Sequence, residues 1–237
     1  MSPFPTKTAA REAVWDALRT QGVARFPYPP HGRIPNFAGA EEAARRLMAH
    51  PWLEGVRAIK ANPDAPQRPL RRLALEQGIR VFMPTPRLRA GFYRLDPDRI
   101  PEGNLREAAS LSRGKRWAES VPVGELAGGI DLVVTGSVAV VRDGRRCGKG
   151  HGYGDLEYAL LRELGHPPLP VATMVHPLQL VEGFPADPLD LPVSLIATPE
   201  ETIEVPDPPP APAGIDWAAL PEGALTEMPV LKELKGR

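Results

Sequence analysis

Five short apolar segments, separated by helical or turn-rich sequence, constrain the fold of this chain more than any other feature. Residues 68–78 have helical spacing, end at a glycine and join two of these segments. A strand, helix and strand in this order indicate a parallel crossover connection. We therefore expect a three-layer α/β/α domain with a mostly parallel sheet. The expected strands are residues 56–61, 79–84, 130–141, 171–176 and 193–199.

Helical spacing also indicates helices outside the crossover. The segment 26–37 separates the first two of them, and its four prolines exclude regular structure there. That segment should be an ordered or wrapping loop. The other expected helices are residues 6–19, 40–48 and 155–165.

A proline-rich stretch marks the expected domain boundary. Prolines fill five of the seven positions from 206 to 212, which favours an extended linker. We therefore expect the α/β domain to occupy residues 1–205 and a proline-rich extension to occupy residues 206–237. The extension either docks on the domain through Trp217 and Leu220 or is mobile.

Composition excludes several classes of protein. The 237 residues include 29 basic and 29 acidic side chains, and a formal net charge of zero argues against a general nucleic-acid binder. No apolar run approaches the roughly 18 to 20 residues that span a bilayer, so we expect no membrane partner. The amino terminus lacks a continuous apolar segment, and the single Cys147 cannot form an internal disulfide. These features predict a cytoplasmic protein, either a monomer or a homodimer.

Residues 144–158 are the most informative stretch for function. Glycines alternate with larger residues, so the backbone can turn sharply and present successive N–H groups to an anion. Arg146 and Lys149 add positive charge, and the following helix adds the positive end of its dipole. Phosphate is the expected anion. The glycines are Gly148, Gly150, Gly152 and Gly154.

Asp155 begins the expected helix next to the phosphate position. It is either an N-cap of that helix or a ligand for Mg²⁺. A simpler interpretation remains open, in which the segment is a glycine-rich turn and Asp155 is an ordinary cap. The loop has neither P-loop spacing nor the GxGxxG fingerprint, so a nucleotide site here must be of another kind.

The order of Arg, Gly-x-Gly-x-Gly and Tyr-x-Asp resembles the signature R-x-G-x-G-x-G-Y-Y-D-R of the 5-formyltetrahydrofolate cyclo-ligases, also called methenyltetrahydrofolate synthetases. Gly154 stands at the second tyrosine of the signature, and Leu156 stands at its last arginine. The likeness covers about residues 6–205. The matching residues are Arg146, Gly148, Gly150, Gly152, Tyr153 and Asp155.

Other segments carry the same resemblance. Lys7 and Arg11 match the K-x-x-x-R with which the family reaches ATP phosphates; without the resemblance, two basic residues on a surface helix indicate only a solvated face. Asp64 and Gln67 occupy the positions of a glutamate and a threonine that line the family's folate pocket. Leu189 replaces a family histidine. Further matches are Gln179, Asp190, Pro192, Val193 and Thr198.

The sequence is most similar to the methenyltetrahydrofolate synthase domain-containing branch of this family, which shares segments such as HGRIPNF, KANPDAP and VTGSVAV. The resemblance implies ATP-dependent conversion of 5-formyltetrahydrofolate to 5,10-methenyltetrahydrofolate, with release of ADP and phosphate. The departures at Gly154, Leu156 and Leu189 leave an alternative, a non-catalytic nucleotide- or folate-binding homologue with a regulatory or structural role.

The resemblance also implies a role for each candidate residue. Arg146 and Lys149 are the expected catalytic residues, and Mg²⁺ is expected at Asp155. The expected substrate-binding residues are Asp64, Gln67 and Tyr153. The expected ATP-binding residues are Lys7, Arg11, Arg146, Gly148, Lys149, Gly150, Gly152, Tyr153 and Asp155.

Overall fold

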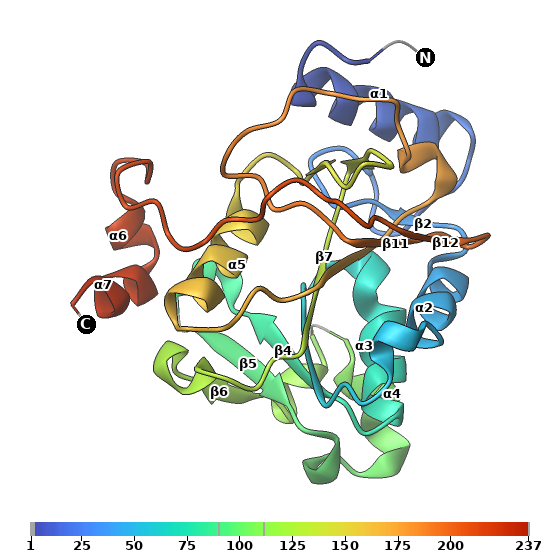
Figure 1. Ribbon diagram of the computed structural model, residues 1–237. Coiled ribbons are helices and arrows are strands. Elements are labelled where there is room, and N and C mark those ends of the chain that lie inside the picture. Colours follow the sequence, from blue (N-terminus) through green and yellow to red (C-terminus); the bar gives the residue numbers. More distant parts are fainter. Residues whose placement is uncertain (1–2, 90, 111, 237) are drawn as a thin grey trace.

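The computed structural model describes residues 3–89, 91–110 and 112–236 (Figure 1). Over these residues the main sheet has eight strands in the order β12-β11-β10-β7-β3-β4-β5-β6. Its five central strands run parallel, as expected from their continuous apolar character. They are β3 (Ala58–Ala61), β4 (Arg80–Pro84), β7 (Leu132–Thr135), β10 (Val171–Met174) and β11 (Leu195–Ala197).

Antiparallel strands that the sequence pattern did not indicate extend both edges of the sheet. On one side β5 (Phe92–Leu95) pairs with β4, and β6 (Glu119–Val121) pairs with β5. On the other side β12 (Thr202–Glu204) pairs with β11. The sheet is therefore mixed at its edges and parallel at its centre.

The segment 130–141 is two strands rather than the single strand expected. β7 ends at Thr135, and the chain leaves the sheet at Gly136, where a Cβ atom would lie 2.9 Å from the side chain of Ile34. It then forms β8 (Ala139–Val140), which pairs antiparallel with β9 (Arg146–Cys147). This small hairpin carries the glycine-rich loop out above the sheet.

Helices cover both faces of the sheet, which confirms the three-layer α/β/α architecture. Successive strand residues point to opposite faces. Ile59 and Val134 pack with α2 and α3 in one apolar cluster, whereas Val133 and Val171 pack with α5 in another. The α-helices of these layers are α2 (Ala40–Met48), α3 (Arg68–Glu76), α4 (Leu105–Ala108) and α5 (Tyr153–Glu163).

The amino-terminal helix α1 (Lys7–Thr20) lies outside these layers, against the β8–β9 hairpin. Val14 and Trp15 pack there with Cys147. The Trp15 indole also donates a hydrogen bond of 3.1 Å to the carbonyl oxygen of Arg33. Two short strands, β1 (Ala24–Arg25) and β2 (Asn36–Phe37), close the proline-rich loop at its base.

Short 3₁₀ helices connect many of the larger elements. They are Pro51–Leu53, Ala65–Gln67, Pro86–Leu88, Pro97–Arg99, Glu102–Asn104, Gly114–Arg116, Val123–Leu126 and Pro177–Gln179. Most have a proline at their first turn, where its fixed φ suits the helix. Part of the high proline content is thus accommodated at the starts of these short helices.

Residues 206–236, here called the tail, are docked on α5 and are not a free extension. The tail contains α6 (Ala224–Glu227) and α7 (Pro229–Lys235), which lie beside α5 in Figure 1. Leu231 and Ile215 are buried in the same apolar cluster as α5, with Trp217 and Leu220 partly buried against it. The tail was expected either to dock on the domain or to be mobile, and in the structure it is docked.

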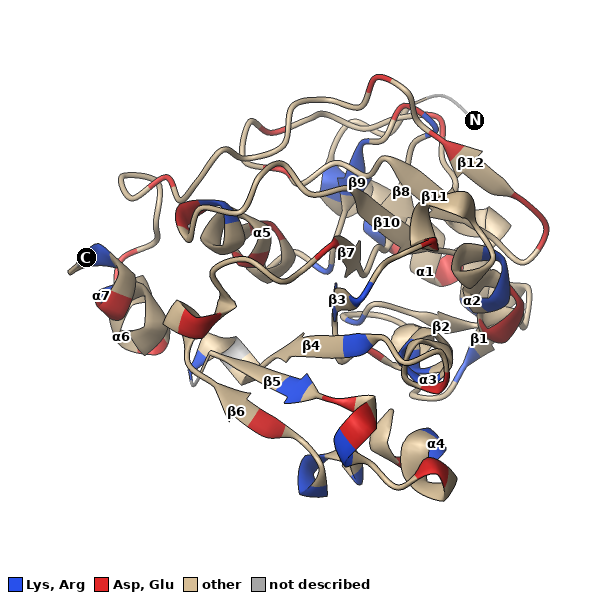
Figure 2. Ribbon diagram, turned by 60° about the horizontal axis from the view of Figure 1, so that its bottom comes forward, with Lys and Arg blue, Asp and Glu red and all other residues tan. Residues whose placement is uncertain are grey.

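Charged residues in Figure 2 lie mainly on the helices, loops and edge strands, and β7, β10 and β11 carry none. In the described part of the chain, none of the helices combines the length and apolar character needed to cross a membrane.

Candidate functional site

The glycine-rich loop, residues 148–152, leads from β9 into α5. Gly150 and Gly152 have φ values of +104° and +69°, in the left-handed region that glycine adopts most readily. Gly152 is the N-cap of α5 and has no side chain to cap the helix. Helix α5 begins at Tyr153, two residues earlier than expected. Because no side chain caps it, its first N–H groups are available to an anion.

The interpretation of Asp155 as an N-cap is wrong, because Asp155 lies within the first turn of α5. Its carboxylate forms an ion pair with the guanidinium of Arg146 and accepts the backbone N–H of Leu191 at 2.8 Å. Arg146 is buried, and it also donates to the carbonyl oxygens of Leu191 at 2.9 Å and Gly136 at 3.4 Å. These contacts fix the start of α5 to the strand that precedes the loop.

The Thr135 hydroxyl crowds the position at which the cyclo-ligase signature has its second tyrosine. A Cβ atom on Gly154 would lie 3.2 Å from the Thr135 hydroxyl and 3.5 Å from a terminal nitrogen of Arg146. A tyrosine at this position would therefore require the Thr135 side chain to shift by a few tenths of an ångström, whereas the distance from its Cβ atom to Arg146 is an ordinary van der Waals contact.

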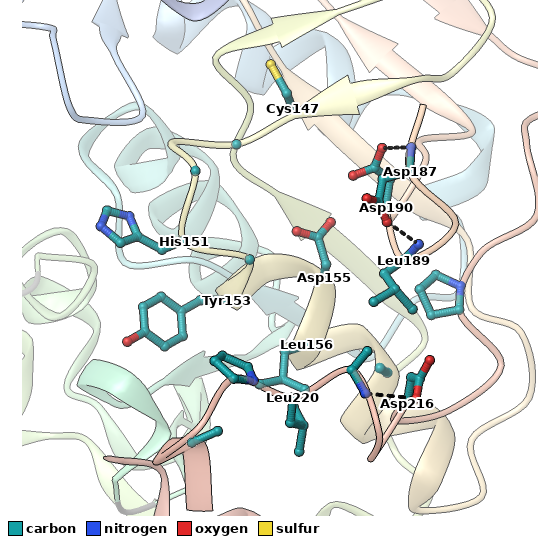
Figure 3. A pocket seen from close by; sticks show the side chains of 18 of the residues that line it. Cys147, His151, Tyr153, Asp155, Leu156, Asp187, Leu189, Asp190, Asp216 and Leu220 are labelled. Carbon is teal, nitrogen blue, oxygen red and sulfur yellow. Dashed lines mark hydrogen bonds between the residues drawn. The ribbon is translucent and has the colours of Figure 1, made fainter. Parts of the chain in front are cut away.

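A cavity of about 480 Å³, here called the loop–tail cavity, lies on one side of the loop (Figure 3). Lys7 and Arg11, which the resemblance assigns to ATP phosphates, line it from α1. Arg11 donates a hydrogen bond of 2.6 Å to the carbonyl oxygen of Gly148, and Lys7 pairs with Asp190 at 2.5 Å. Residues far apart in the sequence thus gather positive charge and loop backbone at one place.

A second cavity of about 350 Å³, here called the loop–sheet cavity, lies on the other side of the loop. Asp64 and Thr85 line it just after the carboxyl ends of β3 and β4, and Thr135 lines it at the end of β7. Ligands of open α/β sheets bind at this edge. Lys149 also lines this cavity, with its ammonium 3.6 Å from the Asp64 carboxylate.

The two cavities share the loop as a common wall. Among the described residues, both are lined by Arg146, Gly148, His151, Gly152, Tyr153 and Asp155. The expected ATP-binding residues are therefore divided between the two cavities. Lys7, Arg11 and Gly150 line the loop–tail cavity alone, and Lys149 lines the loop–sheet cavity alone.

Gln67 is the expected site residue that the structure does not bring to either cavity, as far as the described lining residues show. It ends the 3₁₀ helix Ala65–Gln67, and its side chain is buried. Within the described chain, neither polar atom of its side-chain amide has a hydrogen-bond partner.

Sequence reasoning missed a buried polar cluster below the loop–sheet cavity. Lys60 of β3 forms an ion pair with Glu157 of α5, and Asn62 bridges them, donating to Glu157 at 2.9 Å and accepting from Lys60 at 3.2 Å. Glu157 also lines the cavity. A lysine inside an apolar strand and a glutamate on the apolar face of a helix were the signals that could have revealed the pair.

The carboxylate of Asp155 offers a position for Mg²⁺. Its contacts in the described chain both use Oδ1, which leaves Oδ2 for a cation. Magnesium is commonly held by one or two carboxylates together with substrate phosphates. Among the described residues no group of three or more His, Cys, Asp or Glu could hold a metal. A single carboxylate of this kind would hold Mg²⁺ only together with the phosphate oxygens of a ligand.

Sequence comparison identifies the family of the chain. A model of the 5-formyltetrahydrofolate cyclo-ligase family matches residues 7–199. The mouse methenyltetrahydrofolate synthase domain-containing protein is 42% identical over 98% of this chain, and its human counterpart is 36% identical over 98%. The chain spans 64% and 62% of the lengths of these two relatives.

Solved structures show the same fold at low sequence identity. The Aquifex aeolicus 5,10-methenyltetrahydrofolate synthetase has a TM-score of 0.55 at 17% identity, covering 85% of this chain and 93% of that one. The Mycoplasma pneumoniae synthetase has a TM-score of 0.50 at 15% identity, covering 81% of this chain and 97% of that one.

Proposed function

Because the chain belongs to the 5-formyltetrahydrofolate cyclo-ligase family, we propose that it closes the ring of 5-formyltetrahydrofolate at the expense of ATP. The products are 5,10-methenyltetrahydrofolate, ADP and phosphate. The names of the relatives and of the matched structures support this substrate class.

The observation that carries the proposal is the position of the loop between two cavities. A cyclo-ligase must bring the γ-phosphate of ATP to the formyl oxygen of the folate. The loop–tail cavity holds Lys7 and Arg11 for the phosphates, while the loop–sheet cavity lies at the strand ends, where α/β sheets bind ligands. Two substrates bound on the two sides would meet at the glycines and the first turn of α5.

The chemistry needs little covalent work from the protein. The formyl oxygen attacks the γ-phosphorus, and the bond to ADP breaks. The second folate nitrogen then attacks the activated carbon, phosphate leaves with the formyl oxygen, and the proton of that nitrogen goes to phosphate. Positioning and charge neutralisation dominate such a transfer.

Each residue of the site has a proposed part in this scheme. Lys7 and Arg11 hold the phosphate chain, and the N–H groups from Gly150 to Tyr153 neutralise charge at the γ-phosphate. Lys149, on the folate side, stabilises the transferring phosphoryl group. Bound with ATP and held by Asp155, Mg²⁺ would supply further charge neutralisation.

Arg146 has a different role from the direct phosphate contact that the signature suggested. Its guanidinium N–H groups contact Asp155, Leu191 and Gly136 in the described chain, so Arg146 acts as a positioning residue that keeps α5 aligned with the loop. Tyr153, at the boundary of both cavities and stacked on His151 with ring centroids 6.2 Å apart, packs against the folate.

The test mixes purified protein with ATP, Mg²⁺ and 5-formyltetrahydrofolate and follows methenyl absorbance. Arg11→Ala should lower kcat/KM by about tenfold or more, since a hydrogen bond to a charged group is worth roughly 1.5 to 3 kcal/mol. Arg19→Ala, on the exposed end of α1 and paired with Asp16, is the matched control and should leave turnover unchanged.

Absence of methenyl formation in a protein that binds ATP would reject this reaction. It would favour the non-catalytic alternative, a nucleotide-binding homologue.

A further inference from the structure

The tail is attached to α5 by specific contacts as well as by apolar packing. Glu163, at the end of α5, accepts the backbone N–H of Ile215 at 3.1 Å and the Trp217 indole N–H at 3.4 Å. Leu231 of α7 is fully buried against the same helix. The tail is thus held at a fixed place beside the loop.

The tail forms much of the loop–tail cavity. Ten of the 25 described residues that line this cavity lie between Pro212 and Met228. The family match ends at residue 199, so this wall lies beyond it. The mouse alignment leaves out 2% of the chain, which is far less than the tail, so most of the tail has a counterpart in that relative.

Two parts of the cavity differ in chemistry. Lys7, Arg11 and the loop backbone form one part. Leu156 of α5 and Leu220 of the tail line another part of the cavity and lie close together below Asp155 in Figure 3. Leu156 stands where the cyclo-ligase signature has an arginine, so this part is apolar where that signature is charged.

Carboxylates of the tail also line the cavity. Glu222 and Glu227 line it from exposed positions, and Asp216 lines it as well. Carboxylates repel phosphate but accept hydrogen bonds from hydroxyl and amino groups. At the loop end, Asp190 is paired with Lys7 and Asp155 with Arg146, whereas among the described residues Glu222 and Glu227 form no ion pair. This difference favours a ligand whose anionic end points to the loop and whose donor-rich end points to the tail.

We propose that the tail forms the nucleoside-binding wall of the ATP site. The base packs against Leu156 and Leu220, and the carboxylates of Glu222 and Glu227 accept hydrogen bonds from ribose hydroxyls and amino groups. A nucleotide has the required polarity, with a flat, largely apolar base, hydroxyl donors and an anionic chain. A cavity of about 480 Å³ is in the range of small-molecule sites.

This inference rests on the proposed function, since it takes ATP as the ligand of the loop–tail cavity. It goes further in assigning the nucleoside half of the site to residues beyond the family match. It predicts that the tail discriminates ATP from a bare triphosphate chain.

The test is calorimetric titration of the full chain with Mg·ATP and with magnesium tripolyphosphate. The readout is selectivity, the ratio of the tripolyphosphate Kd to the ATP Kd. Leu220→Ala should reduce this selectivity about tenfold while tripolyphosphate affinity stays the same. Leu225→Ala, in α6 and outside the described cavity lining, is the matched control and should leave selectivity unchanged.

A second variant avoids any disturbance of tail packing. Glu222→Gln/Glu227→Gln changes two exposed side chains and should reduce selectivity at least threefold. If the parent protein turns over and selectivity is unchanged in both variants, the inference is rejected and the proposed function stands. Higher ATP affinity in Leu220→Ala would show that the tail obstructs the site and would also reject the inference. A parent protein that binds neither probe would reject the proposed function.

Discussion

Replacing Asp155 by asparagine distinguishes two roles of this residue, a helix cap and a partner in a buried ion pair. Asparagine caps a helix about as well as aspartate, so a cap predicts almost no change in stability. The structure instead pairs Asp155 with Arg146, whose side chain is 2% exposed, while that of Asp155 is 25% exposed. Removing the negative charge therefore leaves a buried guanidinium without its counter-charge.

The magnitude follows from these contacts. Breaking a buried pair by removing one partner destabilises by about 3 to 5 kcal/mol. The asparagine amide would keep an oxygen for Arg146 and for the N–H of Leu191, and the site is partly open to solvent, so we expect about 2 kcal/mol for Asp155→Asn. For a chain of this length, that corresponds to a Tm about 4 to 8 °C lower.

Urea unfolding without ATP or Mg²⁺ measures this loss free of any metal effect. Asp98→Asn, at an exposed carboxylate, is the control and should stay within about 0.5 kcal/mol of the parent. The m-value should be unchanged, because the same surface is exposed on unfolding. An Asp155→Asn variant as stable as the control would refute the assigned ion pair.

Three further predictions concern groups that are buried or half-buried. Lys60→Met should destabilise by about 3 to 5 kcal/mol in urea unfolding, because Glu157 loses its buried partner, and Lys60→Met/Glu157→Leu should recover most of the loss; a double variant no better than the single one would contradict this. Desolvation lowers the pKa of His176 in the folded state, so the fold binds fewer protons there than the unfolded chain. This contribution to stability is complete above the unfolded pKa of about 6.5 and is lost as pH falls through the lowered value. Stability measured from pH 7.5 to 5 should therefore fall less steeply in His176→Gln, and an unchanged slope would argue against it. Burial raises the pKa of the Cys147 thiol, so iodoacetamide at pH 8 should label the folded protein at least tenfold more slowly than the urea-unfolded protein; equal rates would show the thiol to be accessible.

The central sheet was predictable because its strands are buried on both faces and appear as continuous apolar runs. The edge strands were not. β12 is largely exposed, and β6 has Glu119 in a surface ion pair with Arg94, so neither shows a strong apolar pattern. Edge strands commonly carry such charges. Their pairing depends on neighbours that local sequence does not reveal.

The loop was also predictable, because alternating glycines next to basic residues have a direct physical meaning. Which residues join it was not. Arg11 meets Gly148 across 137 positions, and only the family resemblance linked them. The proline-rich stretch suggested a boundary, and Trp217 and Leu220 were the residues expected to dock; the structure adds Ile215 and Leu231, which are buried in the same apolar cluster as α5. The start of α5 was misplaced because Gly152, and not Asp155, is the N-cap.

The stoichiometry of a single turnover tests the central claim most directly. With enzyme in excess and γ-labelled ATP, the two-cavity scheme predicts one phosphate released for each 5,10-methenyltetrahydrofolate formed, and phosphate release should require the folate. Phosphate release at the same rate without 5-formyltetrahydrofolate, or no methenyl product from a complex that holds both substrates, would contradict a reaction at the shared loop.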